Sequence, residues 1–275
     1  MFKIIKKIQF SIITILEKYP RFNLFILNNI IYFKFFLPHE KDYYGIKLIF
    51  KETKNLNAFL DVGANVGTST LGFIRMGFEN RMYLFEPNYF LCKKYLRKIE
   101  KKYCNIFVYN YALGSKNKLL VFYLPYIGKI FLHYFSSFNK KYVMNSCLNT
   151  FPNQQITLKK KIIKLKKFDD LKIKDAIDFI KIDSEGHDLE VIKGLKKTIN
   201  RFKPAFLIEY NADLYLKIVN RLNKYSQFYY DLKKNSLVEI NNYNLKILCR
   251  FGNRDRLSIR NVFFIHKDKL RSLNC

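Results

Sequence analysis

Short apolar runs alternate with helical segments along most of this chain. From residue 42 onward, runs of β-branched and aromatic residues are followed by stretches whose apolar positions recur at helical spacing. This alternation predicts βαβ units and an α/β fold with a mostly parallel sheet and helices on both faces. Strands are expected at 58–62, 82–85, 106–110, 119–124, 179–182, 205–208, 228–231 and 262–265, and helices at 69–76, 89–101 and 189–198.

Two stretches depart from this pattern. Residues 126–155 carry scattered aromatics without a clear period, so they are predicted to be an insert that could serve as an acceptor lid. Residues 1–40 are basic and aromatic, and they predict either a helical cap on the main domain of 41–275 or a helix lying on a membrane surface. No apolar run is long enough to span a bilayer, and the opening residues lack a signal-peptide cleavage site.

The chain is strongly basic, with 50 Lys and Arg against 22 Asp and Glu and a formal net charge of +28. Such a charge suits nucleic acid, anionic lipid or an anionic substrate. A genome rich in A and T would also spread lysine over every solvated face, so net charge alone does not choose a partner. Five cysteines without a C-x-x-C pair argue against a disulfide framework and a zinc ribbon, and they favour a cytoplasmic protein, with peripheral membrane contact through 1–40 as the alternative.

A carboxylate and a glycine turn follow the first expected strand. Asp61 lies at the end of that strand, Gly63, Asn65 and Gly67 form the turn into a helix, and Glu86 ends the next strand. The spacing G-x-N-x-G lacks the middle glycine with which a dinucleotide fold approaches a pyrophosphate. Asp61 would also repel a phosphate, whereas a ligand with an ammonium and a sulfonium, such as S-adenosylmethionine (SAM), would be attracted. A carboxylate at Glu86 can accept the hydroxyls of the adenosine ribose.

A second acidic site is expected at the same edge of the sheet. Eight of the 22 acids lie between residues 169 and 190, and several of these suit helix starts. Asp183 and Glu185 instead follow a strand, and Glu209 ends the next one, so the three carboxylates should converge and supply a general base. A metal held by Asp183, His187 and an acid is conceivable, but His187 is better explained as a helix-start residue, and no metal is predicted.

Six blocks of sequence resemble the FkbM-family methyltransferases, in the order expected for that family. They are 60–67 (LDVGANVG), 84–88 (LFEPN), 110–114 (NYALG), 164–171 (KLKKFDDL), 180–186 (IKIDSEG) and 208–209 (IE). The resemblance implies a class I Rossmann-like fold with seven strands, SAM as cofactor, and O-methyl transfer. Ser184 and Phe168 depart from the usual residues of the family, and both are expected to change packing alone.

The resemblance also implies roles for individual residues. Asp61, Gly63, Asn65 and Gly67 would line the methionine end of SAM, Glu86 would hold the ribose, and the backbone at Ala112 and Leu113 would meet the adenine. Asp183 would face the transferable methyl group. It is the first choice as base, with Glu185 second and Glu209 as an orienting group.

The acceptor that the resemblance implies is a hydroxyl of a sugar, a glycan or a related small metabolite. One rival is a nucleic-acid methyltransferase, which the net charge favours. The chain lacks the Asn/Asp-Pro-Pro-aromatic turn of enzymes that methylate amino groups of bases, so no specific nucleic acid is expected. A second rival is a non-catalytic protein of the same fold that binds a membrane or a partner.

Overall fold

The computed structural model describes residues 41–50, 56–241 and 261–270. These residues form two compact units, one drawn from 40–120 and 163–275 and the other from Val121–Ile162. The predicted segment 1–40 lies outside the described residues. Within the described part of the chain, no helix combines the length and the apolarity needed to cross a bilayer.

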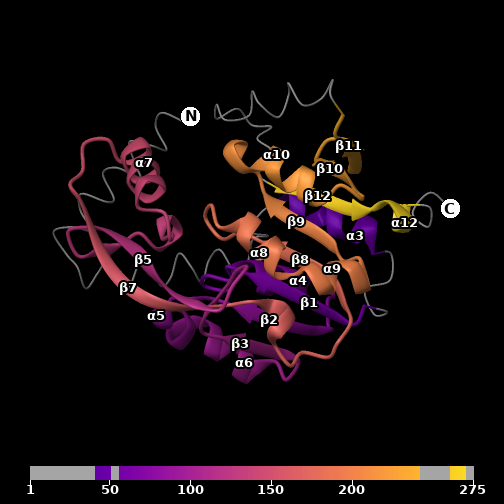
Figure 1. The fold of residues 1–275 in the computed structure, drawn as a ribbon, viewed down its shortest axis with the longest axis horizontal. Helices are drawn as coiled ribbons and strands as arrows, with labels where there is room; N and C mark the ends of the chain where they lie inside the picture. Colours follow the sequence, from indigo (N-terminus) through magenta and orange to yellow (C-terminus); the bar gives the residue numbers. More distant parts are fainter. Residues whose placement is uncertain (1–40, 51–55, 242–260, 271–275) are drawn as a thin grey trace. The chain divides into compact units, whose positions relative to one another are not determined.

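The larger unit is built on one eight-stranded sheet of order β11-β10-β12-β9-β8-β1-β2-β3 (Figure 1). Strands β3, β2, β1, β8 and β9 are parallel, while β12 runs antiparallel to both β9 and β10. The strands are β1 (Ala58–Val62), β2 (Arg81–Phe85), β3 (Ile106–Tyr109), β8 (Ile177–Ile182), β9 (Ala205–Glu209), β10 (Tyr225–Asp231), β11 (Ser236–Glu239) and β12 (Asn261–His266).

The expected α/β fold is confirmed, but the predicted number of seven strands was wrong, because the sheet has eight. The extra strand, β11, is a short edge strand that pairs with β10 alone, as the second half of a hairpin. Its turn is closed by Asp231, whose carboxylate accepts the backbone N–H groups of Lys233 and Lys234. Such a short, half-exposed strand carries little apolar signal, which is why the sequence did not indicate it.

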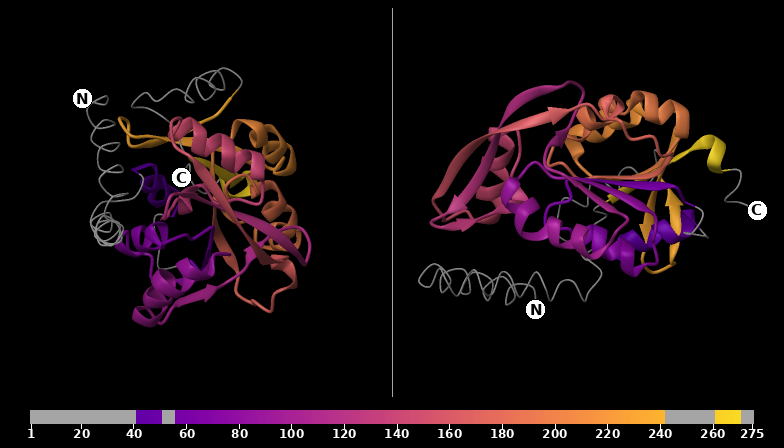
Figure 2. Two further views of the ribbon diagram at one scale, coloured as in Figure 1. Left: turned by 90° about the vertical axis from the view of Figure 1, so that its left-hand side faces the viewer. Right: turned by 90° about the horizontal axis from the view of Figure 1, so that it is seen from below.

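Helices cover both faces of the sheet because successive residues of the buried strands point to opposite sides. Leu60 packs with helices on one face and Phe59 packs with those on the other. In Figure 2 the orange helices and the violet helices lie on opposite sides of the strands. The first face carries α8 (Asp188–Gly194), α9 (Lys196–Phe202) and α10 (Ala212–Arg221), and the second carries α3 (Gly45–Ile49), α4 (Thr68–Arg75) and the run α5 (Tyr89–Leu91), η3 (Cys92–Leu96) and α6 (Arg97–Lys102).

The smaller unit contains the insert, and it is more regular than its sequence indicated. It holds an antiparallel hairpin of β5 and β6, a short 3-10 turn and an α-helix, and β7 leads out of it. Helix α7 is capped by Asn139, whose side chain accepts the backbone N–H of Tyr142, and it buries Val143 and Cys147. The elements are β5 (Lys118–Ile127), β6 (Ile130–Phe131), η4 (His133–Phe135), α7 (Lys140–Thr150) and β7 (Ile156–Lys166). The predicted role as an acceptor lid stays a prediction.

Candidate functional site

The turn after β1 is left-handed at its three key residues. The φ angles are +77° at Gly63, +51° at Asn65 and +85° at Gly67, and asparagine adopts this region more readily than most residues other than glycine. A Cβ atom on Gly63 would lie 1.8 Å from the carbonyl oxygen of Asp183, which no rearrangement of a side chain could relieve. The turn therefore brings the backbone of β1 directly against the residue that ends β8.

Asp61 is fully buried, and its carboxylate faces protein groups. Its Oδ2 accepts hydrogen bonds from the hydroxyls of Ser69 and Thr70, both at 2.7 Å, and its Oδ1 lies 3.4 Å from the ammonium of Lys181. These contacts tie the strand to the first turn of α4 and fix the glycine turn between them. The implied contact of Asp61 with the methionine end of SAM stays a prediction.

Glu86 connects the end of β2 to the same turn. Its Oε2 accepts the backbone N–H of Asn65 at 2.9 Å, and its Oε1 accepts that of Asn88 at 2.7 Å. The side chain is only 6% exposed, and this burial raises the pKa of Glu86 to about 7, against the lowering effect of the two backbone donors. The acid and the turn that the sequence singled out thus form one hydrogen-bonded unit.

The residues around Ala112 and Leu113 lie next to Glu86 and the glycine turn. Asn110 donates from its side-chain amide to the carbonyl oxygens of Glu86 and Pro87, at 3.0 and 3.1 Å. Ala112 and Leu113 form the short strand β4 and are both buried. Their implied contact with adenine stays a prediction.

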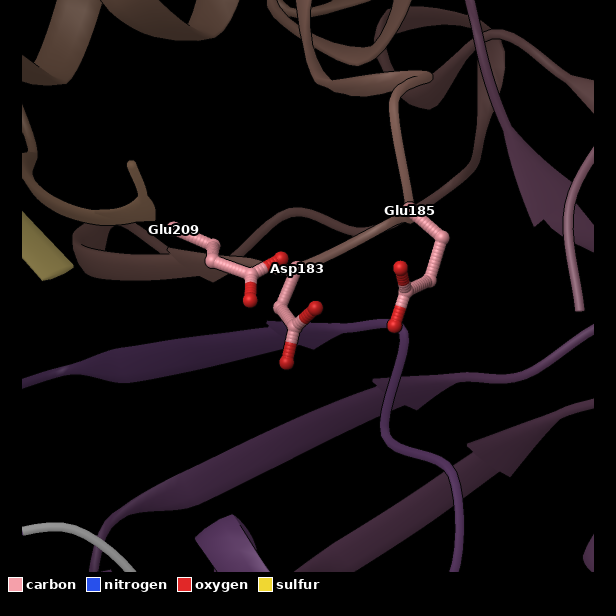
Figure 3. A group of neighbouring side chains, drawn as sticks. All are labelled: Asp183, Glu185 and Glu209. Carbon is pink, nitrogen blue, oxygen red and sulfur yellow. The ribbon is translucent and has the colours of Figure 1, made fainter. Parts of the chain in front are cut away.

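The structure brings Asp183, Glu185 and Glu209 together, as the sequence predicted. One carboxylate oxygen from each lies within 4.8 Å of the others, and Figure 3 shows the three side chains pointing toward a common centre. Glu185 takes part because the loop after β8 is left-handed, with φ of +50° at Glu185 and +86° at Gly186. A non-glycine residue held in this region is strained, which is common at functional sites. Oxygen atoms this close could also ligate a divalent cation, so the expectation of a site without metal stays a prediction.

Lys181 is the residue of this site that the sequence analysis missed. It lies on β8 with 2% exposure, and its Nζ is 3.2 Å from Oδ2 of Asp183 and 3.4 Å from Oδ1 of Asp61. The same ammonium donates to the carbonyl oxygen of Gly63 at 3.4 Å. A single cation inside the apolar run 179–182 is the signal that could have identified it, because a buried lysine needs an anionic partner.

Other acids of the 169–190 cluster have the structural roles expected of helix starts and turns. Asp169 accepts the backbone N–H groups of Lys197 and Thr198 at the start of α9. Asp188, in the first turn of α8, accepts both the backbone N–H and the hydroxyl of Ser184. The idea that Ser184 changes only packing was therefore wrong, because its hydroxyl closes the loop onto the helix.

His187 and Phe168 also lie outside the carboxylate group. His187 is the N-cap residue of α8, where burial lowers its pKa, and a Cβ on Gly114 would lie 3.1 Å from its Nε2. The predicted place of His187 at the start of a helix is confirmed, but the expected surface position was wrong, because the side chain is half-buried. Phe168 is buried in the core and meets Phe85 edge-on, so the expected packing role of Phe168 is confirmed as well.

Comparison with known proteins gives a family match over most of the larger unit. A family model described as "Methyltransferase FkbM domain" matches residues 61–229, more than half of the chain. The crystal structure of methyltransferase FkbM from Methylobacillus flagellatus KT is similar at 19% identity and a TM-score of 0.47, over 82% of this chain and 48% of that one. The chain thus spans about half the length of that relative.

Two further solved structures are similar over 82% of this chain, each with 11% identity and a TM-score of 0.37. One is a precorrin-6y C5,15-methyltransferase from Geobacter metallireducens GS-15, of which 86% is covered. The other is the N-terminal domain of human METTL16 in complex with SAH, of which 67% is covered. None of the curated proteins matches the chain.

Proposed function

Because this chain belongs to the FkbM family of SAM-dependent methyltransferases, we propose that it transfers the methyl group of SAM to a hydroxyl of a sugar, a glycan or a related small metabolite. The observation that carries the proposal is the group of three carboxylates at the ends of β8 and β9, beside the glycine turn. Proton removal from an acceptor hydroxyl needs a base of this kind at this edge of the sheet.

The residues around the turn fit a cationic nucleoside. The close approach at Gly63 requires a residue without a side chain. Around the turn, three carboxylates (Asp61, Asp183 and Glu86) face one ammonium, that of Lys181, so these contacts favour a positively charged ligand. In the proposal, the backbone of Gly63, Asn65 and Gly67 cradles the methionine end and Asp61 holds that turn in place. Glu86 accepts the ribose hydroxyls, and the backbone at Ala112 and Leu113 meets the adenine.

When bound, SAM supplies a methyl carbon that is activated by a sulfonium. The chain then has to align the acceptor oxygen with that carbon and remove one proton. Asp183 takes the proton, Glu209 orients the acceptor hydroxyl, and Glu185 is the alternative base. Lys181 contacts Asp183 from within the sheet, so it fixes the direction in which that carboxylate points.

Isotope transfer to an acceptor tests the proposal. The full chain, incubated with SAM that carries a CD₃ group and with extracts of glycans, lipid-linked sugars or total RNA, should add a labelled methyl group to a sugar hydroxyl, as read by mass spectrometry of fragments. Heat-denatured protein is the control. Label on RNA bases alone would favour a nucleic-acid enzyme, and SAM binding without transfer to any fraction would favour a non-catalytic role.

SAM affinity should depend on pH through Glu86. With a pKa of about 7 this carboxyl is largely protonated in the free chain near pH 6, and a protonated acid cannot accept both ribose hydroxyls. Binding should therefore tighten as the pH rises, by about tenfold between about pH 6 and pH 8, and then level off. Calorimetric titrations across this range measure the effect.

The matched control is Glu86→Gln, which keeps the shape of the side chain and removes its titration. We expect this variant to bind SAM more weakly than the parent at pH 8. Its affinity should also change less with pH, because residue 86 no longer titrates and the amino group of SAM still does. An unchanged profile in Glu86→Gln would assign the dependence to another group.

A further inference from the structure

The helical run α5–η3–α6 presents an outer surface made of aromatic and cationic side chains. Tyr89 and Phe90 are 65% and 50% exposed, although the same run buries Leu91 and packs Leu96 and Ile99 into the core on one face of the sheet. The run packs beside β3 at the end of the eight-stranded sheet (Figure 1). We call the outward residues the basic aromatic face; its members are Tyr89, Phe90, Lys93, Lys94, Arg97, Lys98, Lys101 and Lys102.

The positive charge of this face is not balanced within the run. Its one acid, Glu100, accepts the backbone N–H of Val108 at 2.8 Å and pairs with Arg97, so it compensates one cation at most. Burial and the neighbouring ammonium of Lys98 both lower the pKa of Lys94. The folded chain thus keeps like charges close together, which is unfavourable unless an anionic partner offsets it.

The aromatic rings are interleaved with these cations. The ammonium of Lys94 lies 5.2 Å from the ring centre of Phe90, and that of Lys93 lies 5.9 Å from the ring of Tyr89. Exposed aromatic rings beside lysines are typical of surfaces at the boundary of a lipid bilayer, where the rings enter the headgroup region and the cations meet anionic lipids.

We propose that the basic aromatic face docks on an anionic phospholipid bilayer. An outward helix face is convex, which suits a broad surface of headgroups better than a single nucleic-acid strand, because such strands bind in grooves. Docking through this face is independent of methyl transfer and of residues 1–40. Since α5 begins three residues after Glu86, it would hold the end of β2 close to the lipid.

Vesicle flotation of the full chain tests the proposal. We expect binding to phosphatidylcholine vesicles that contain about 40% phosphatidylglycerol, little binding without the anionic lipid, and release by salt. Replacing three cations (Lys93→Gln, Lys94→Gln and Lys98→Gln) should weaken partitioning at least about tenfold, since each lysine near an anionic surface strengthens binding. The double variant Tyr89→Ser and Phe90→Ser should also weaken it.

The control is a matched set on α10, where Leu216 is 62% exposed beside two exposed cations. The variant Leu216→Ser, Lys217→Gln and Arg221→Gln should partition as the parent does. Hydrogen exchange with vesicles should slow in 89–102, which separates this face from any contact through 1–40. The proposal is overturned if the control loses as much binding, if 89–102 shows no protection, or if the face variants lose binding to RNA but not to vesicles.

Discussion

Replacing Lys181 by methionine should lower the rate of methyl transfer by about 10²-fold, an effect within the range of general-base catalysis. Methionine fills a similar volume but carries no charge, so Asp183 loses the donor at 3.2 Å that fixes its direction and Asp61 loses the ammonium 3.4 Å from its Oδ1. We expect kcat to fall while the KM for SAM changes little, because the glycine turn and Glu86 stay in place. Steady-state kinetics with the identified acceptor measure this split.

A purely structural role of Lys181 would produce a similar loss through unfolding, so the experiment needs a second variant. Removing the partner of a buried carboxylate should cost about 3 kcal/mol of unfolding free energy. Adding Asp61→Asn to Lys181→Met removes the uncompensated charge, and the two hydroxyls that Asp61 accepts can still bond to the amide. We expect the double variant to regain most of the stability but not the rate. Recovery of both together would show that Lys181 only supports the fold.

The parallel core of the sheet could be predicted because its strands are buried on both faces. Strand β1 matches its expected bounds, and β2, β8 and β9 differ from theirs by one or two residues. Since parallel strands present their carboxyl ends at one edge, the convergence of Asp183 and Glu209 followed from the same pattern.

The contact between Lys181 and Asp61 could not be predicted from the sequence of either strand alone. Asp61 and Lys181 lie opposite each other because β1 pairs with β8, although the two residues are 120 positions apart in sequence. Which strands become neighbours is decided by packing of the whole domain. A sequence pattern indicates that a strand exists, but not which residue it faces.

The smaller unit was misjudged for a different reason. Strand β7 was not predicted, because its charged residues (three lysines in succession at 159–161) hide the alternation of a half-exposed strand. Helix α7 buries only Val143 and Cys147 of its eleven residues, and Asn139 caps its start. Small units bury little apolar surface, so their sequences carry weak periodic signals.

The variant Asp183→Asn should lose methyl transfer by about 10²- to 10⁴-fold and still bind SAM within about twofold of the parent, as expected for removal of a general base. Asparagine has the same shape, and its amide oxygen can still accept from the ammonium of Lys181, so the loop after β8 should keep its course. It cannot take a proton from the acceptor hydroxyl. Single-turnover transfer of the labelled methyl group, beside calorimetry with SAM, separates the two properties.

Glu209→Gln is the matched comparison, because it removes a charge from the same group of carboxylates at the end of the next strand. If Glu209 only orients the acceptor, this variant should lose about tenfold, mostly in the KM for the acceptor. A loss in kcat larger than that of Asp183→Asn would exchange the two roles. Equal, near-normal rates in both variants would exclude each of them as the base and leave Glu185 to be tested by the same substitution to glutamine.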